Sequence, residues 1–125
     1  MFTFDIILHL LLISVCGLAS AIQDKISFRW DDVPTWMKKR DSFWNPVISW
    51  KNKWKEGLPE NGERFFGSST FLVCFTDGWH LMKEVMISSI CISLSMCSGM
   101  WWMYIVFRLL FFIGFLYYYV KENKN

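Results

Sequence analysis

The chain has 125 residues, enough for one domain at most. Thirteen Lys and Arg residues against eleven Asp and Glu give a net charge of +2, which is too balanced for a nucleic-acid binder. Hydrophobic residues make up 54% of the chain and are segregated: residues 2–22 and 85–120 are apolar, whereas residues 23–67 hold most of the charge. This segregation excludes an ordinary soluble domain and is typical of an integral membrane protein with one polar segment.

The first predicted element is a membrane-spanning helix over about residues 3–22. Its apolar run, "IILHLLLISVCGLASAI", reaches about 20 residues with the preceding residues added, which is the length that crosses a hydrocarbon core. A cleaved signal peptide is the alternative, because "ASA" at 19–21 resembles a cleavage site. The start, "MFTFD", carries no Lys or Arg, and we therefore favour a retained anchor.

The polar segment, residues 23–67, contains five of the eight tryptophans. Its prolines and glycines break the helical pattern, which predicts an irregular cap with one or two short helices rather than a second domain. Tryptophans and lysines interleave most densely in "SWKNKWKEG", at Trp50, Lys51, Lys53, Trp54 and Lys55. On a helix, the two tryptophans would share one face.

Interleaved indoles and ammonium groups suit a segment at the bilayer surface, with the indoles at headgroup depth and the lysines against anionic phosphate. A surface for a partner protein is the competing interpretation. Aromatic and basic residues also alternate in single-stranded nucleic-acid binders, but seven acids dilute the positive field of this segment. We therefore expect no nucleic-acid partner.

The next element, residues 68–120, is predicted to be a helical hairpin. One division makes residues 85–107 a single helix, which leaves residues 109–120 too short to cross a bilayer. The other breaks the chain at "CSG", residues 97–99, and gives helices over about 69–96 and 100–120. The "GSST" at 67–70 offers N-cap residues for the first of them. The second division leaves no partial span, and it predicts three crossings in total.

The basic residues predict the orientation. Nine Lys and Arg lie between the first and second spans and two more in the polar tail, residues 121–125, but none lies in the N-terminal stub or at the "CSG" turn. The positive-inside rule then places the N-terminus outside and the C-terminus in the cytoplasm of a cell, or inner, membrane. The expected fold is an all-α integral membrane protein with three transmembrane helices, organised as a single membrane domain over residues 1–125.

A polar cluster, "TDGWHLMKE" at residues 76–84, lies beside this apolar sequence. Asp77, His80 and Glu84 are spaced i, i+3, i+7 and would form one stripe on a helix. Such a stripe could bind a divalent ion or transfer protons as a catalytic site facing the cytoplasm. The structural interpretation, which we favour, is the solvated end of a membrane helix. One helix supplies only three ligands and the other histidine, His9, is expected at the opposite face, so we expect no metal and no cofactor.

Arg108 is the other charge expected inside the membrane, on the third span. A lone arginine at that depth costs about 2.5 kcal/mol or far more. Glu84 on the second span would lie within reach of its long side chain. We therefore predict an Arg108–Glu84 ion pair, direct or bridged by water, that holds these two helices together.

The cysteines fall in apolar stretches, at Cys16, Cys74, Cys91 and Cys97. Their spacing matches neither a disulfide framework nor a zinc site. We expect them to be small residues packed between helices.

The string "WNPVISWKNKWKEG", followed by "ERFFGSSTFLVCFTDGWHLMK", resembles small uncharacterised multi-span membrane proteins of bacteria and phages, over about residues 44–83. The resemblance implies a short membrane protein of unassigned function and brings no site residues with it. The expected function is an accessory or interaction role, with residues 23–67 contacting lipid headgroups, a membrane-protein partner or a second copy. The alternative is a membrane enzyme or an ion- or proton-handling protein that uses Asp77, His80 and Glu84.

Overall fold

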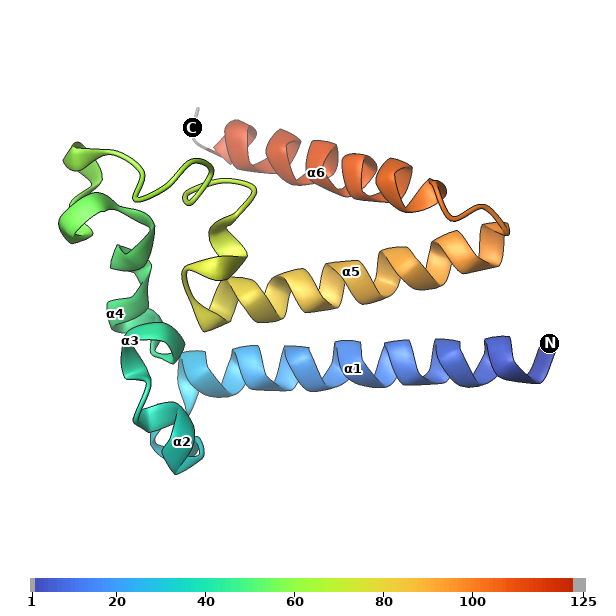
Figure 1. The fold of residues 1–125 in the computed structure, drawn as a ribbon, viewed down its shortest axis with the longest axis horizontal. Helices are drawn as coiled ribbons and strands as arrows, with labels where there is room; N and C mark the ends of the chain where they lie inside the picture. Colours follow the sequence, from blue (N-terminus) through green and yellow to red (C-terminus); the bar gives the residue numbers. More distant parts are fainter. Residues whose placement is uncertain (1, 123–125) are drawn as a thin grey trace. The chain divides into compact units, whose positions relative to one another are not determined.

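The computed structural model describes the backbone of residues 2–122 and the side chains of residues 5–119. Three long helices dominate it: α1 (Phe2–Phe28), α5 (Gly78–Ser98) and α6 (Met103–Glu122) (Figure 1). Within the described residues there is no β-strand, and extended pairing is limited to one isolated antiparallel bridge between Trp54 and Glu63. The expected all-helical class is confirmed.

The chain divides into two compact units, one of residues 1–14 with 87–125 and the other of residues 15–86. The boundary between them falls inside α1 and inside α5. The single membrane domain over residues 1–125 stays a prediction.

Helix α1 is longer than the span expected over residues 3–22, since it continues to Phe28. No proline interrupts the sequence before Arg29, and Ile26 near the helix end is buried in a small core. Two hydroxyls inside the helix bond to the carbonyl one turn earlier: Ser14 Oγ donates to Leu10 O and Ser27 Oγ to Gln23 O, each at 2.8 Å. Such bonds satisfy a polar side chain without any partner outside the helix.

Two helices are long and apolar enough to cross a membrane by length and composition, over Asp5–Phe28 and Gly78–Ser98. In their most apolar stretches only 6% and 17% of the residues are buried. The core helix of a soluble protein would be mostly buried, so these exposed apolar surfaces favour a lipid environment. The described apolar part of α6, Met103–Tyr119, is shorter, and three crossings are therefore not established by this criterion.

Short helical pieces make up the polar segment, and there are more of them than the one or two expected. They are η1 (Trp30–Asp32), α2 (Thr35–Lys38), α3 (Asp41–Trp44), α4 (Pro46–Ser49), η2 (Trp50–Lys53), η3 (Lys55–Gly57) and η4 (Pro59–Asn61), where η marks a 3₁₀ turn. The turn η2 ends before Trp54, whose backbone is extended. Trp50 and Trp54 therefore do not share a helical face, because the segment changes direction between them.

A small apolar core holds the unit of residues 15–86 together. Ile26 from α1, Val33 and Met37 are buried, and the partly buried hydrophobic residues packed against them are Ile22, Trp30, Trp44 and Trp79. Trp44 also lies directly on Gly78, where an added Cβ would come within 2.8 Å of its Cζ3 atom. This close approach joins the polar segment to the first residue of α5.

The expected start of the second span near residue 69 is wrong, since α5 begins at Gly78. The glycine in "GSST", Gly67, has a φ of 83°, and the backbone N–H groups of Gly67 and Ser69 donate to the Glu63 carboxylate at 3.1 and 3.3 Å. These bonds make "GSST" a turn around Glu63 instead of a helix cap. A further 3₁₀ turn, η5 (Val73–Phe75), follows before Asp77 starts the helix.

The break at "CSG" is confirmed. Helix α5 ends at Ser98, and Gly99 has a φ of 75° while its N–H donates to Met96 O at 3.1 Å, a common glycine termination of a helix. The single helix over residues 85–107 is thereby excluded. Helix α6 starts at Met103 rather than residue 100, because Trp101 and Trp102 form a turn.

Residues 87–98 of α5 and α6 run antiparallel within one unit (Figure 1). A hydrogen bond of 3.1 Å between Ser88 Oγ and Tyr104 Oη joins them. The predicted polar tail, residues 121–125, lies outside the residues whose side chains the structure describes.

Candidate functional site

Asp77 caps the N-terminus of α5. Its side chain is 3% exposed, and its Oδ1 accepts a hydrogen bond of 2.8 Å from the backbone N–H of His80. Aspartate is among the best residues at this position, because the carboxylate satisfies an N–H group that has no partner within the helix. The hydroxyl of Thr76 also donates to Asp77 Oδ2 at 3.2 Å. The carboxylate is therefore held in place by the backbone and by its neighbour.

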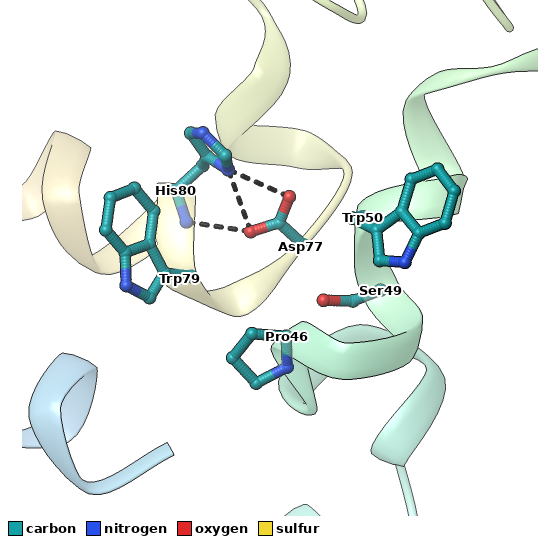
Figure 2. A pocket seen from close by; sticks show the side chains of 6 residues that line it. All are labelled: Pro46, Ser49, Trp50, Asp77, Trp79 and His80. Atoms are coloured by element: carbon teal, nitrogen blue, oxygen red, sulfur yellow. Dashed lines mark hydrogen bonds and ion pairs between the residues drawn. The ribbon is translucent and has the colours of Figure 1, made fainter. Parts of the chain in front are cut away.

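The imidazole of His80 lies against the same carboxylate (Figure 2). Its Nδ1 atom is 2.9 Å from Asp77 Oδ2 and 3.0 Å from Asp77 Oδ1. The structure thus brings together two members of the predicted stripe, at the i, i+3 spacing that the sequence showed. When the imidazole is protonated the contact is an ion pair with charge-assisted hydrogen bonds.

A hollow of about 130 Å³ opens beside this pair. It is lined by Pro46, Ser49, Trp50, Asp77, Trp79 and His80, and Figure 2 shows the residues of α4 and η2 facing the start of α5. Sites for drug-sized ligands occupy about 300–1,000 Å³, whereas a water molecule takes about 30 Å³. The hollow has room for a few water molecules or a small ion.

The amide of Asn52 joins the polar segment to the residues that precede α5. Its Nδ2 atom donates to Ser42 O at 2.7 Å and to Thr76 O at 2.8 Å. One side chain therefore ties the polar segment to the residue that precedes the cap of α5. Nothing in the local sequence pattern predicted this bond, because its partners lie 10 and 24 residues away.

Glu84 is the third member of the predicted stripe. It is half-buried on α5, seven residues after Asp77, which corresponds to about 10 Å along a helix axis. Among the residues that the structure describes, no group of three His, Cys, Asp or Glu side chains could hold a metal ion. Asp77 and His80 form one acid–imidazole pair, and a catalytic role for Glu84 beside them stays a prediction.

The predicted contact residues of the polar segment place ammonium groups on indole rings. Lys51 Nζ is 5.7 Å from the ring centroid of Trp50, and Lys53 Nζ is 6.0 Å from that of Trp54. Both distances are within the range of cation–π attraction. Trp50 is 43% exposed and Lys55 is also exposed, so this part of the segment presents its charge and aromatic surface outward.

Glu63 organises the second half of the segment, and sequence analysis missed it. The hydroxyl of Ser69 and the backbone N–H groups of Gly67 and Ser69 donate to its carboxylate. The bond from the Ser69 hydroxyl is the main cause that lowers the pKa of Glu63 below its ordinary value of 4.5, and the two backbone bonds add to it. Next to this turn, Ser68 is fully buried and donates to Lys53 O at 2.7 Å, which holds Lys53 and Trp54 in position.

The predicted Arg108–Glu84 pair stays a prediction. Arg108 is half-buried on α6 and Glu84 is half-buried on α5, and the two residues belong to different compact units.

No protein-family model, curated protein or solved structure matches this chain.

Proposed function

We propose that the chain is a small integral membrane protein with an accessory or interaction role, whose residues 23–67 bind anionic lipid headgroups at the bilayer surface. The observation that carries the proposal is the position of Trp50. Its indole is 43% exposed, holds the Lys51 ammonium 5.7 Å from its ring, and lies in an irregular segment between two lipid-length apolar helices.

Three crossings are part of this proposal. The apolar surface of α1 is largely exposed, few residues of α5 are fully buried, and α6 with 20 residues would extend about 30 Å, which matches the hydrocarbon core. Exposed aromatic residues at both ends of α6, Trp101 and Trp102 before it and Tyr117–Tyr119 in its last described turns, suit the two interfaces.

A retained first span is supported by the course of α1. The helix continues without interruption through "ASA" at residues 19–21, the sequence that resembles a cleavage site. Ala19 in this sequence is 2% exposed. Beyond it, Ile26 is part of the small core. Cleavage there would remove most of α1 while leaving its packed end behind.

The proposed orientation has the N-terminus outside and the C-terminus in the cytoplasm of the inner membrane, because the basic residues gather in residues 23–67 and in the tail. Reporter fusions at each end of the full chain test it. We expect a cytoplasmic reporter to be active only at the C-terminus. Activity of the same reporter at both ends would refute an odd number of crossings.

Electrostatics favour anionic headgroups as the ligand of the Trp50–Gly57 stretch. It carries three lysines against one glutamate, and a lysine near an anionic surface contributes about 1 kcal/mol. The indoles of Trp50 and Trp54 place apolar ring surface beside those charges, so phosphate contact and shallow ring insertion can occur together.

Hydrogen exchange on the full chain in lipid nanodiscs tests headgroup binding. We expect residues 50–57 to exchange more slowly in discs that contain phosphatidylglycerol than in pure phosphatidylcholine discs. The triple variant Lys51→Gln, Lys53→Gln, Lys55→Gln should lose this difference. A matched variant that neutralises the basic run at residues 38–40 should keep it. Equal exchange in the two lipids, or equal losses in the two variants, would contradict the proposal and favour a protein partner.

A second candidate is proton transfer by Asp77 and His80, favoured by their hydrogen-bonded contact beside a hollow that can hold water. It ranks second because capping α5 already accounts for the burial of Asp77. Proteoliposomes with an internal pH dye separate the two functions. Proton handling predicts a flux that His80→Ala abolishes and Trp50→Ala leaves intact, whereas an accessory protein shows no such flux.

A further inference from the structure

His9 on α1 contacts two polar residues of α5 within the unit formed by residues 1–14 and 87–125. Its Nδ1 atom is 2.6 Å from Ser93 Oγ, and its Nε2 atom is 3.7 Å from Cys97 Sγ. Both ring nitrogens are therefore engaged, one by a hydroxyl and the other by a thiol. Neither contact was expected from the sequence, since the partners lie 84 and 88 residues away.

The geometry suits a thiol with a neighbouring base. In the tautomer that carries its proton on Nδ1, His9 donates to Ser93 Oγ and directs the lone pair of Nε2 toward the Cys97 thiol. A nucleophile in contact with an imidazole whose other nitrogen is held by a third group is the usual arrangement for activating a cysteine.

Cys97 is accessible and lies beside apolar surface. Its side chain is exposed, whereas Cys91 on the same helix is buried. The expectation that all four cysteines pack between helices is thus wrong for Cys97, which lies in the last turn of α5. Leu94 and Met100 nearby are exposed, and Trp101 is 83% exposed. An alkyl chain bound to a carbonyl at Cys97 would find apolar side chains to lie against.

We propose that Cys97 is an S-acylation site that accepts a fatty acyl group from an acyl thioester. In the step, His9 Nε2 takes the proton from the Cys97 thiol as Sγ attacks the carbonyl carbon of the donor. A new C–S bond forms, the C–S bond to the donor thiol breaks, and the departing thiolate takes the proton from His9. The products are S-acyl Cys97 and the free donor thiol, with no change of oxidation state.

Ser93 is a positioning residue in this site, since it contacts the imidazole and not the thiol. Without the Ser93 hydroxyl, His9 can also adopt the tautomer that carries its proton on Nε2. In that tautomer an N–H group, and not a lone pair, would face the sulfur. We expect Ser93→Ala to slow acylation and Ser93→Thr to restore it. Ser95→Ala is the matched control, because it removes a hydroxyl of the same helix that donates to Ile92 O at 3.1 Å.

The experiment incubates the full chain in detergent micelles with palmitoyl-coenzyme A and follows acylation of each cysteine by peptide mass spectrometry. We expect a hydroxylamine-sensitive palmitoyl group on Cys97, formed faster than on the half-exposed Cys74, and none there in Cys97→Ser. His9→Gln should lower the rate at Cys97 by about 100-fold, the lower end of what a general base contributes. His80→Gln, which changes the other histidine, should leave the rate unchanged.

The pH dependence separates a base from a merely structural histidine. In the wild type Cys97 should react faster when the imidazole of His9 is neutral than when it is protonated, because only the neutral ring can take the thiol proton, and His9→Gln should lose this dependence on pH. Within residues 5–14 and 87–119, the part of this unit whose side chains the structure describes, the charged residues are Asp5 on α1 and Arg108 on α6. Asp5→Asn should therefore keep the pH dependence of the rate at Cys97.

Alkylation of Cys97 by iodoacetamide should show the same dependence on pH and on His9, which keeps the test valid if a variant binds the acyl donor poorly. Equal acylation rates at Cys97 and Cys74, or a rate and pH profile unchanged in His9→Gln, would overturn the proposal.

Discussion

Replacing Asp77 separates the two roles that its carboxylate can have, and the effects can be worked from the hydrogen bonds. Asp77→Ala removes the acceptor for the His80 N–H, which costs about 1 kcal/mol as a lost N-cap. It also removes the acceptor of the His80 ring, and one net hydrogen bond contributes about 1 kcal/mol, whereas the Thr76 hydroxyl keeps its shorter bond to Val73 O at 2.7 Å. The start of α5 should lose about 2 kcal/mol in total.

Asp77→Asn keeps the cap, because an asparagine oxygen accepts the same N–H bond equally well. Only the second oxygen is lost, replaced by an NH₂ group that cannot accept from Thr76. We therefore expect a cost of about 1 kcal/mol or less. The difference in free-energy loss between Asp77→Ala and Asp77→Asn measures the contribution of the cap. The loss that both variants have in common measures the other contacts of the carboxylate.

Amide hydrogen exchange at the first turn of α5 is the assay. The N–H of His80 bonds to the Asp77 side chain and that of Leu81 to Asp77 O, so both report opening of this turn. About 2 kcal/mol corresponds to about 30-fold faster exchange in Asp77→Ala, and about 1 kcal/mol or less to at most about fivefold in Asp77→Asn. If Asn exchanges as fast as Ala, the negative charge and not the cap explains the burial of Asp77. If Ala changes nothing, the reasoning is refuted.

Two further predictions concern the close packing of the polar segment. Gly78→Ala should destabilise the fold by about 1–3 kcal/mol, because its Cβ would overlap the Trp44 ring, and thermal unfolding in micelles should show this while Gly17→Ala, with open space around it, shows no loss. The contribution of Glu63 should be complete above pH 4.5 and disappear as the pH falls through its lowered pKa, since a protonated carboxyl accepts these bonds poorly. Exchange of the Ser69 amide, corrected for its intrinsic rate, should therefore accelerate in acid in the wild type and stay independent of pH in Glu63→Gln; an unchanged amide in the wild type would contradict the assignment.

Local patterns predicted the features that neighbouring residues determine. The glycine at position 99 ended α5 as expected, because only a residue tolerant of positive φ terminates a helix in this way without strain. The contact between Asp77 and His80 followed from their i, i+3 spacing. Long apolar runs likewise predicted the two helices that are long enough to cross a bilayer.

The features that depend on distant residues could not be predicted. The start of α5 was placed too early because "GSST" looks like a helix cap until the Glu63 carboxylate takes its N–H groups. The bonds of Asn52 and the pairing of His9 with Cys97 join residues that share no periodicity. Periodicity reports which face of an element is apolar, but not which element will cover it.

The amide of Asn52 has a mechanical consequence. The Asn52 side chain bonds to the backbone carbonyls of both Ser42 and Thr76. The polar segment therefore cannot move independently of Thr76 unless these bonds break. A force on Trp50 or Trp54 must either break these two hydrogen bonds or move the N-terminus of α5. A displacement of η2 would in this way reach the Asp77–His80 pair through Thr76, the residue next to Asp77.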